Sequence, residues 1–383
     1  MKLLRSIHKE LSSALEKKMV FIGGPRQVGK TTLSLTFLSP PTPQNEAYLN
    51  WDRSLDKSII LRGELPLHHK ILVLDEVHKF KRWRELLKGL YDKHHETNRF
   101  LVTGSARLDY FRKGGDSLLG RYRYFRLHPL SITEINKNPT KNDLDSLLRF
   151  GGFPECFTEQ NEKHHRIWQK SRLDLVVTQD LRDLENIKEI SLVLLLAEAL
   201  PERVGSPLSL RSIAEDLGVS QPTVDRWIQS LCHLYYCFTI PPYGTPKIRA
   251  VKKHQKLYLW DWSAVPGEGP RFENLVASHL LKYCHFIEDT EGHRMELRYL
   301  RDTDLREIDF VVLKDRKPLF AVECKTGDGA LSPHIKYFRD RTPIPEFYQI
   351  HRGTKRFGNP RSGEVLPFLD FYRELCEKVG HFI

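Results

Sequence analysis

The chain has 383 residues and a formal net charge of +11. This length allows two or three domains, and the positive charge favours an anionic partner, either nucleic acid or a membrane surface. The six cysteines include no C-x-x-C pair, which argues against a zinc ribbon and a disulfide framework. An apolar segment at residues 190–200 is too short to span a bilayer, and residues 1–10 do not resemble a signal peptide. We therefore expect a soluble cytoplasmic protein without a membrane partner.

The first predicted elements are a helix over residues 4–18 and a strand over residues 19–22. The pattern G-x-x-x-x-G-K-T follows and indicates a phosphate-binding loop that leads into a helix. Successive backbone N–H groups of such a loop, together with the helix N-terminus, attract an anion. We expect Lys30 to reach the β- and γ-phosphates of ATP and Thr31 to hold Mg²⁺. The predicted nucleotide-binding residues are Gly24, Pro25, Arg26, Gln27, Val28, Gly29, Lys30, Thr31 and Thr32.

A second strand at residues 47–52 and a helix at residues 54–61 precede a buried strand at residues 70–75. This third strand ends in the acidic pair Asp75 and Glu76, at the edge where α/β sheets bind their ligands. An acidic pair also occurs in ordinary solvated turns, but the preceding phosphate loop favours a catalytic role. We expect Asp75 to bind Mg²⁺ through water and Glu76 to orient and deprotonate the attacking water.

A helix at residues 83–91 and strands at residues 99–105 and 122–127 complete the first predicted domain. Strands that alternate with helices predict a parallel sheet with helices on both faces. Thr103 and Ser105 lie at the same edge as the acidic pair, so either could contact the γ-phosphate or the water. A plain turn at the end of the strand is the alternative interpretation.

Arg121 and Arg123 lie late in this domain, and either could act as an arginine finger on a neighbouring subunit's γ-phosphate. A finger given in trans requires a homo-oligomer. The alternative is a solvated basic loop. His78 stands two positions after Glu76.

Residues 143–200 are predicted to be mostly helical, and residues 208–231 have the pattern of a helix-turn-helix. In this pattern Gly218 makes the turn and Ser220 caps the second helix, with Pro222 in its first turn. The side chains expected to face outward have types that can read a DNA major groove. They are Gln221, Thr223, Arg226 and Gln229.

Two further strands at residues 235–240 and 256–260 could be the wings of a winged helix. A basic loop between them is suited to phosphate contacts. The alternative is a winged helix that only packs against other domains. The basic residues of this loop are Lys247, Arg249, Lys252, Lys253 and His254.

The last predicted site lies on a hairpin of strands at residues 307–313 and 319–325. Residues two apart share a face of a strand, so Glu323 and Lys325 project together, and the hairpin brings Asp309 near them. Two carboxylates could hold a divalent cation, and the lysine could position a water. Glu273, in a predicted helix, is a further acidic candidate. A solvated charged face on a binding domain is the alternative.

The order of these motifs resembles the bacterial and archaeal AAA-type ATPases that carry a C-terminal DUF4143 domain. One departure from the family is His78, where such proteins often have glutamine. The matching residues are Gly24–Thr32, Leu74–Glu76, Thr103–Ser105, Leu119–Arg121, Pro129–Ser131, Glu134, Gly151–Glu155, Ile213–Ala214, Leu217–Ser220, Thr223–Val224, Glu273–Asn274, Glu307–Phe310 and Glu323–Lys325.

The resemblance implies a P-loop parallel-sheet domain of the ASCE type at residues 1–140 and a helical region at residues 141–200. It further implies a winged helix at residues 201–262 and a restriction-endonuclease-like α/β domain at residues 263–383. The resemblance implies no settled biological role, and we predict an ATP-hydrolysing protein that acts on DNA as a translocase, helicase or remodeller. Two alternatives stay open, namely a nucleotide-dependent switch that binds protein partners and an ATP-gated, metal-dependent nuclease.

Overall fold

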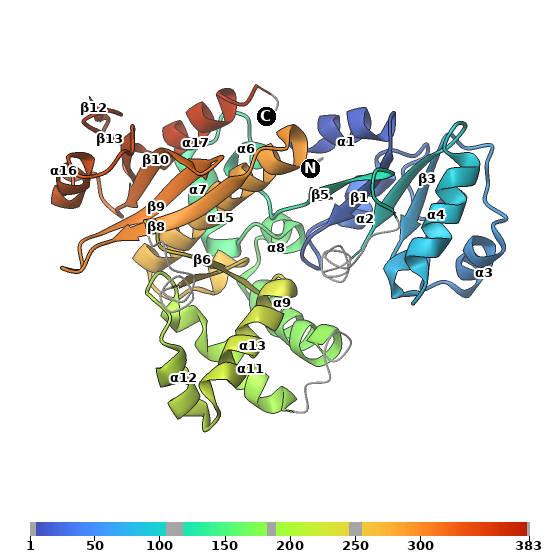
Figure 1. Ribbon diagram of the computed structural model, residues 1–383, viewed down its shortest axis with the longest axis horizontal. Coiled ribbons are helices and arrows are strands. Elements are labelled where there is room, and N and C mark those ends of the chain that lie inside the picture. Colours follow the sequence, from blue (N-terminus) through green and yellow to red (C-terminus); the bar gives the residue numbers. More distant parts are fainter. Residues whose placement is uncertain (1–4, 105–117, 182–188, 245–254, 381–383) are drawn as a thin grey trace. The chain divides into compact units, whose positions relative to one another are not determined.

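The computed structural model describes residues 5–104, 118–181, 189–244 and 255–380 (Figure 1). The chain divides between Leu130 and Ser131 into two compact units. The predicted fold class is confirmed: a parallel-sheet domain is followed by a helical middle and an α/β sheet at the C-terminal end. Within the described ranges no helix is both long and apolar enough to cross a membrane.

The first unit is built on a five-stranded sheet in the order β2-β3-β4-β1-β5, and every neighbouring pair is parallel. Strand β4 therefore separates β1 from β3, and the carboxyl ends of all three strands lie at one edge. The strands are β1 (Met19–Gly23), β2 (Tyr48–Asn50), β3 (Ile71–Asp75), β4 (Arg99–Thr103) and β5 (Tyr122–Arg126). The helices are α1 (His8–Leu15), α2 (Lys30–Leu35), α3 (Ser54–Arg62) and α4 (Trp83–His94).

The second unit begins with the predicted helical region. Helix α7 ends at Gly151, where φ is +74° and a Cβ would lie 2.6 Å from the Asp261 carboxylate, so only glycine fits. The helices of this region are α6 (Ile132–Ile135), α7 (Lys141–Phe150), α8 (Pro154–Glu159), α9 (Glu162–Asp174), a π-helical turn (Leu175–Asp180) and α11 (Ile190–Ala199).

The helix-turn-helix pattern forms α12 (Leu210–Leu217) and α13 (Gln221–His233). As predicted, Gly218 ends α12 in the left-handed conformation, and the Ser220 hydroxyl accepts a hydrogen bond from the Thr223 N–H. The two strands predicted at residues 235–240 and 256–260 are present as an antiparallel pair, β6 (Cys237–Ile240) and β7 (Lys256–Leu259).

The C-terminal part is a six-stranded mixed sheet in the order β12-β13-β11-β10-β9-β8, with helix α15 (Glu268–Glu291) along it (Figure 1). Strands β9 (Glu307–Lys314) and β10 (Lys317–Cys324) form the predicted hairpin. Its two loop residues, Asp315 and Arg316, both have positive φ, as a two-residue type I′ turn requires. The remaining elements are β8 (Met295–Arg301), α16 (Pro333–Arg339), β11 (Phe347–His351), β12 (Phe357–Asn359), β13 (Gly363–Pro367) and α17 (Phe368–Glu377).

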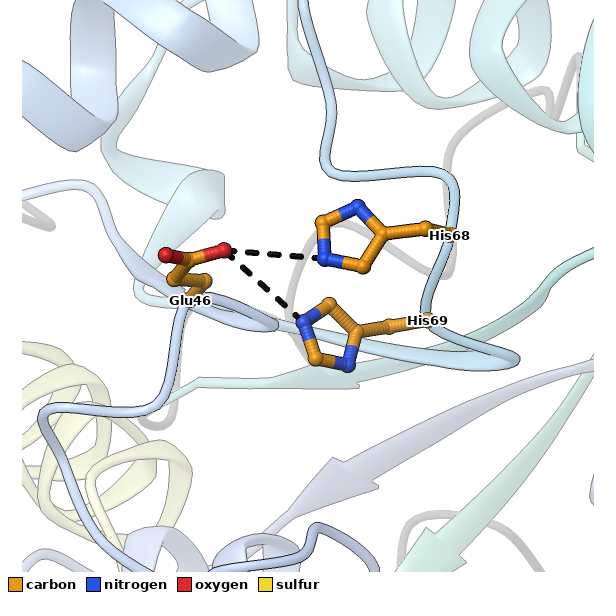
Figure 2. Close-up of side chains that lie close together, drawn as sticks. All are labelled: Glu46, His68 and His69. Atoms are coloured by element: carbon orange, nitrogen blue, oxygen red, sulfur yellow. Dashed lines mark ion pairs between the residues drawn. The ribbon is translucent and has the colours of Figure 1, made fainter.

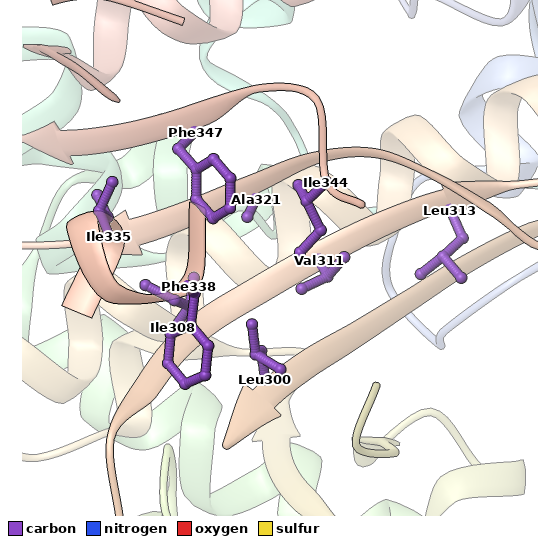
Figure 3. Close-up of a cluster of buried hydrophobic side chains, with 9 residues drawn as sticks. All are labelled: Leu300, Ile308, Val311, Leu313, Ala321, Ile335, Phe338, Ile344 and Phe347. Carbon is purple, nitrogen blue, oxygen red and sulfur yellow. The ribbon is translucent and has the colours of Figure 1, made fainter. Parts of the chain in front are cut away.

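One core of this sheet is made by side chains of β8, β9, β10, β11 and α16 (Figure 3). Ile308 and Val311 are fully buried in this cluster, although charged residues stand close by on the same strand, β9. The buried aliphatic face fixes the register of the hairpin, because a slip of one residue would turn the apolar side chains to the other face. The charged positions of β9 and β10 are thereby held in place.

Candidate functional site

The glycine loop after β1 adopts the backbone that a phosphate-binding loop needs. Gly24, Gln27 and Gly29 all have positive φ, at 135°, 60° and 96°. A Cβ on Gly24 would lie 2.3 Å from the Leu127 carbonyl oxygen, so a side chain has no room there. Left-handed residues in such a loop turn successive N–H groups toward one side, where an anion can bind.

Lys30 folds back onto this loop. Its ammonium donates hydrogen bonds to the carbonyl oxygens of Gly24 (3.0 Å) and Pro25 (2.6 Å), and the residue is 8% exposed. The amine is therefore held within the loop that a phosphate would enter. Arg5 braces the same loop, because its guanidinium donates to the carbonyl oxygens of Val28 (3.2 Å) and His128.

The Asp75 carboxylate at the end of β3 is the centre of a buried network of hydroxyl groups. It accepts hydrogen bonds from Thr31 (2.9 Å), Tyr48 (2.7 Å) and Thr103. Thr103 is one of the two residues that could contact the γ-phosphate or the water, and in this structure its hydroxyl donates to the Asp75 carboxylate. Burial, with the adjacent Asp75 charge next in importance, raises the pKa of the Tyr48 phenol above its usual range.

A hydroxyl and a carboxylate side by side are a donor set that suits Mg²⁺, a hard cation that prefers oxygen ligands. Thr31 and Asp75 supply this pair from two different elements, and both were predicted to hold the metal. The oxygens of Asp75 are fixed by hydroxyl donors on β2 and β4, so the carboxylate does not need to reorient when a cation arrives.

Glu76 follows Asp75 in a strained backbone conformation with φ of +59°. Its N–H donates to the Thr103 carbonyl oxygen at 3.0 Å, which fixes the turn at the end of the strand. Its carboxylate lies 3.6 Å from the buried His78 ring and 3.7 Å from the Lys79 ammonium. Burial and then the Asp75 charge raise the pKa of Glu76, a direction that suits a general base.

Arg121 makes a two-pronged ion pair with Asp92 of α4, with nitrogen–oxygen distances of 2.6 Å and 3.1 Å. Arg123 stacks over the Phe125 ring at 5.0 Å. Within its own chain Arg121 therefore has an anionic partner, and its predicted role as a finger requires that pair to open. Ser105 and the basic loop at residues 247–254 lie outside the described residues.

The residues predicted for the C-terminal site come together. The register of β9 and β10 pairs Phe310 with Val322, and one step further along it places Asp309 opposite Glu323. The Asp309 carboxylate accepts the Cys324 N–H at 2.8 Å, and the Lys325 ammonium donates to Glu323 at 2.7 Å. Burial and then Asp309 raise the pKa of Glu323 to about 7.

Glu273 of α15 joins the same cluster, where it accepts a hydrogen bond from the Tyr258 hydroxyl at 2.7 Å. Burial and then Asp309 raise the pKa of Glu273 to about 8. Glu307 is also a member, and it pairs with Arg301 at 3.3 Å. We call Glu273, Glu307, Asp309 and Glu323 the carboxylate cluster.

The sequence predicted neither Glu307 nor Lys256 of β7 as part of this site. The Lys256 side chain is 1% exposed, and its ammonium contacts Glu307 and lies within 4.0 Å of two other members of the cluster. Burial alone would lower the pKa of Lys256, but the surrounding carboxylates outweigh it and raise the pKa above its usual range. The sequence signal that could have indicated Lys256 was its charge at the start of the otherwise apolar run Lys-Leu-Tyr-Leu-Trp.

A third group of possible metal ligands lies on the surface of the first unit (Figure 2). His68 and His69 both point an imidazole nitrogen at the Glu46 carboxylate, at 3.6 Å and 4.0 Å. Of the described residues, only these three bring three such ligand atoms within 4.8 Å of one another. The Glu46 side chain is 76% exposed, so the contact is an ordinary surface ion pair that a transition metal could also use.

Family models match three consecutive stretches of the chain. A AAA domain model, AAA_14, matches residues 16–136. Models of two domains of unknown function, DUF8612 and DUF4143, match residues 141–265 and 268–371.

Two similar curated proteins carry the description uncharacterized. Rv2008c of Mycobacterium tuberculosis is 26% identical over 246 residues, which cover 63% of this chain and 54% of the relative. MJ1544 of Methanocaldococcus jannaschii is 22% identical over 358 residues, covering 85% of this chain and 78% of the relative. The chain thus spans about half the length of the mycobacterial protein.

Two solved structures show low similarity to this chain. RuvB of Thermotoga maritima, a Holliday junction branch migration motor, aligns with a TM-score of 0.31 and 17% identity over 65% of this chain and 90% of its own. ORC1 of Aeropyrum pernix, solved in complex with DNA, aligns with a TM-score of 0.31 and 15% identity over 70% of this chain and 91% of its own.

Proposed function

Because the chain carries a AAA domain followed by a DUF4143 domain, we propose that it is an ATPase whose nucleotide site lies in the first unit. One observation carries the proposal. The glycine loop with Lys30, the Thr31 hydroxyl and the Asp75–Glu76 pair converge at one edge of a parallel sheet. Each has the chemistry that one part of γ-phosphate hydrolysis requires.

Each residue has a separate task in this proposal. The loop N–H groups bind the phosphates, and Lys30 exchanges the carbonyl oxygens of Gly24 and Pro25 for phosphate oxygens. Thr31 and Asp75 hold Mg²⁺, which supplies positive charge against the phosphates. Glu76 orients a water molecule and takes its proton as the water attacks the γ-phosphorus in line and ADP leaves.

The raised pKa of Glu76 supports this assignment. A carboxylate is a better proton acceptor when its pKa is closer to the working pH, and the buried site with Asp75 beside it shifts Glu76 in that direction. The His78 ring and the Lys79 ammonium lie 3.6 Å and 3.7 Å from the same Glu76 carboxylate oxygen, so this side chain has neighbours that hold it in place.

We further propose that ATP hydrolysis is coupled to DNA. The chain has a net charge of +11, and α13 exposes Gln221, Arg226 and Gln229 while Val224 and Trp227 are buried. A helix with polar and basic side chains outside and an apolar face inside is suited to the major groove. In this proposal the helices α12 and α13 with the hairpin β6–β7 form a winged helix, and the protein works as a homo-oligomer.

The test is ATP turnover with and without single-stranded, duplex and branched DNA. Stimulation by one of these supports coupling to DNA. ATP turnover that no DNA changes favours the alternative, a nucleotide-dependent switch that acts on protein partners. A chain that binds no ATP would refute both.

A further inference from the structure

Lys256 places a positive charge inside the carboxylate cluster. Its ammonium contacts Glu307 and lies 3.4 Å from a Glu273 oxygen and 3.8 Å from an Asp309 oxygen. It also lies 5.5 Å from the centroid of the Tyr299 ring. A buried ammonium surrounded by three carboxylates is their counter-ion, because the charges could not stay buried without one another.

The position of Lys256 is set by β7, a strand that does not belong to the C-terminal sheet. The backbone of Leu259 exchanges two hydrogen bonds of 2.8 Å with the Asn274 side chain of α15. Gly205 lies over the cluster with φ of +78°, and a Cβ there would come within 3.1 Å of both Glu273 carboxylate oxygens. Strand β7 therefore packs against α15, the helix that carries Glu273 of the cluster.

Strand β7 also links the cluster to the helix-turn-helix. It pairs with β6 along its whole length, and β6 starts four residues after α13 ends at His233. A displacement of α13 that reaches the hairpin would withdraw Lys256 from the carboxylates. Lys256, the cation in the cluster, thus lies on β7, and the hairpin β6–β7 follows the proposed DNA-reading helix α13 in the chain.

The cluster has the donors that a hard divalent cation prefers, since all its ligands are carboxylate oxygens. In the described part of the chain no three of these residues bring a carboxylate oxygen within 4.8 Å of one another, and the Lys256 ammonium lies within 4.0 Å of three of the four carboxylates. One oxygen of Glu323 accepts from Lys325, while the other is buried and, among the described residues, has no hydrogen-bond partner. A buried carboxylate oxygen without a donor is suited to a cation.

We propose that the carboxylate cluster is a divalent-cation site that Lys256 closes, and that Mg²⁺ or Mn²⁺ binds there only after β7 has carried Lys256 away. Ammonium and metal compete for the same oxygens, so the wild-type chain at rest binds no metal at the cluster. This inference does not rest on ATP hydrolysis, because the cluster lies in the second unit and shares no residue with the nucleotide site.

The test replaces Lys256 with an uncharged side chain of similar length in the full chain. Lys256→Gln leaves the carboxylates without their counter-ion, so its melting temperature falls by about 5–15 °C in metal-free buffer. Mn²⁺ then raises the melting temperature of Lys256→Gln, and calorimetry shows one Mn²⁺ site that the wild type lacks. Wild-type melting shows no Mn²⁺ response that Glu323→Gln removes.

Two controls isolate the cluster. Lys282→Gln removes another buried ammonium, which pairs with Glu134 outside the cluster, so it lowers the melting temperature without a response to Mn²⁺. All proteins carry His68→Ala and His69→Ala, because the surface histidines could bind Mn²⁺ themselves. Adding Glu323→Gln to Lys256→Gln removes the new site.

Two results would overturn the inference. One is a folded Lys256→Gln protein that gains no Mn²⁺ or Mg²⁺ binding. The other result comes from an experiment that uses no lysine variant and so applies even when Lys256→Gln does not fold. The wild type and Asp309→Asn are titrated with Mn²⁺, and binding is followed by electron paramagnetic resonance. A wild-type site that Asp309→Asn removes would show that metal binds while Lys256 is present. Identical Mn²⁺ titrations of the wild type and Asp309→Asn support the inference that Lys256 closes the site.

Discussion

The Thr31 hydroxyl and the Asp75 carboxylate lie 2.9 Å apart, although 44 positions separate them in the sequence. The sheet order creates this contact. Strand β4 stands between β1 and β3, so the loop after β1 and the end of β3 meet over the carboxyl end of β4. The contact joins the phosphate-binding part of the site to the part that holds the metal and activates water.

Tyr48 is predicted to support Asp75 without touching the nucleotide. Tyr48→Phe removes a buried hydroxyl that donates to the carboxylate at 2.7 Å. The loss of one hydrogen bond to a charged group costs about 1.5–3 kcal/mol of unfolding free energy. A less firmly held Asp75 also raises the Mg²⁺ concentration that half-maximal ATP turnover requires.

The measurement for Tyr48 is urea unfolding together with a Mg²⁺ titration of ATP turnover. Tyr91→Phe is the matched control, since Tyr91 lies on α4 and its ring stacks on His95. Equal Mg²⁺ requirements in Tyr48→Phe and the wild type would contradict the supporting role.

Arg121 can be tested through its partner Asp92. A finger must leave Asp92 to reach a neighbouring subunit, so Asp92→Asn frees Arg121 and keeps or increases turnover, while Arg121→Ala lowers it at least about tenfold. If the ion pair only braces α4 against β5, the two variants have the same small effect. Turnover of both variants, measured at protein concentrations where the chain is assembled, separates these cases.

His279 is predicted to make the second unit acid-sensitive. Its Nδ1 hydrogen-bonds the Leu275 carbonyl oxygen at 2.8 Å, and its Nε2 accepts the Ile132 N–H at 3.1 Å, so the folded state needs the neutral ring. Burial lowers the pKa of His279 from 6.5 to about 3, with the Leu275 hydrogen bond, Lys282 and Glu134 as lesser influences.

The sign of the effect follows from proton uptake. Between pH 6.5 and about 3 the unfolded chain binds a proton at this ring and the folded chain does not, so the unfolding free energy falls as pH falls. The slope is about 1.4 kcal/mol per pH unit. Urea unfolding at pH 7.5 and pH 5.5 is expected to show a larger loss in the wild type than in His279→Gln. Equal losses would show that His279 takes up its proton in the folded state.

The first unit was largely predictable from the sequence because its signals are local. Apolar runs mark the strands, and the glycine pattern and the acidic pair mark the ends of β1 and β3. The hairpin that carries Asp309 and Glu323 was predictable for the same reason. Its alternating pattern and short turn determine which residues face one another.

Contacts between distant segments were not predictable in the same way. Lys256 lies 17 positions before Glu273 but 51 and 53 positions before Glu307 and Asp309, and the packing of β7 on α15 brings these residues together. Its sequence signal was a charge at the start of an apolar strand. The Tyr48 hydroxyl and the Asp92 partner of Arg121 depend likewise on side-chain directions that periodicity does not give.

ATP turnover by Glu76→Gln tests the central claim most directly. The amide keeps the size of the side chain but cannot accept a proton from water, so this variant binds ATP as the wild type does and loses turnover by at least about a hundredfold. Lys30→Ala is the companion variant, and it loses ATP binding itself because the phosphates lose their lysine. Fluorescent-nucleotide binding and phosphate release, measured on the same preparations, give both quantities. Wild-type turnover in a Glu76→Gln protein that binds ATP would contradict the account.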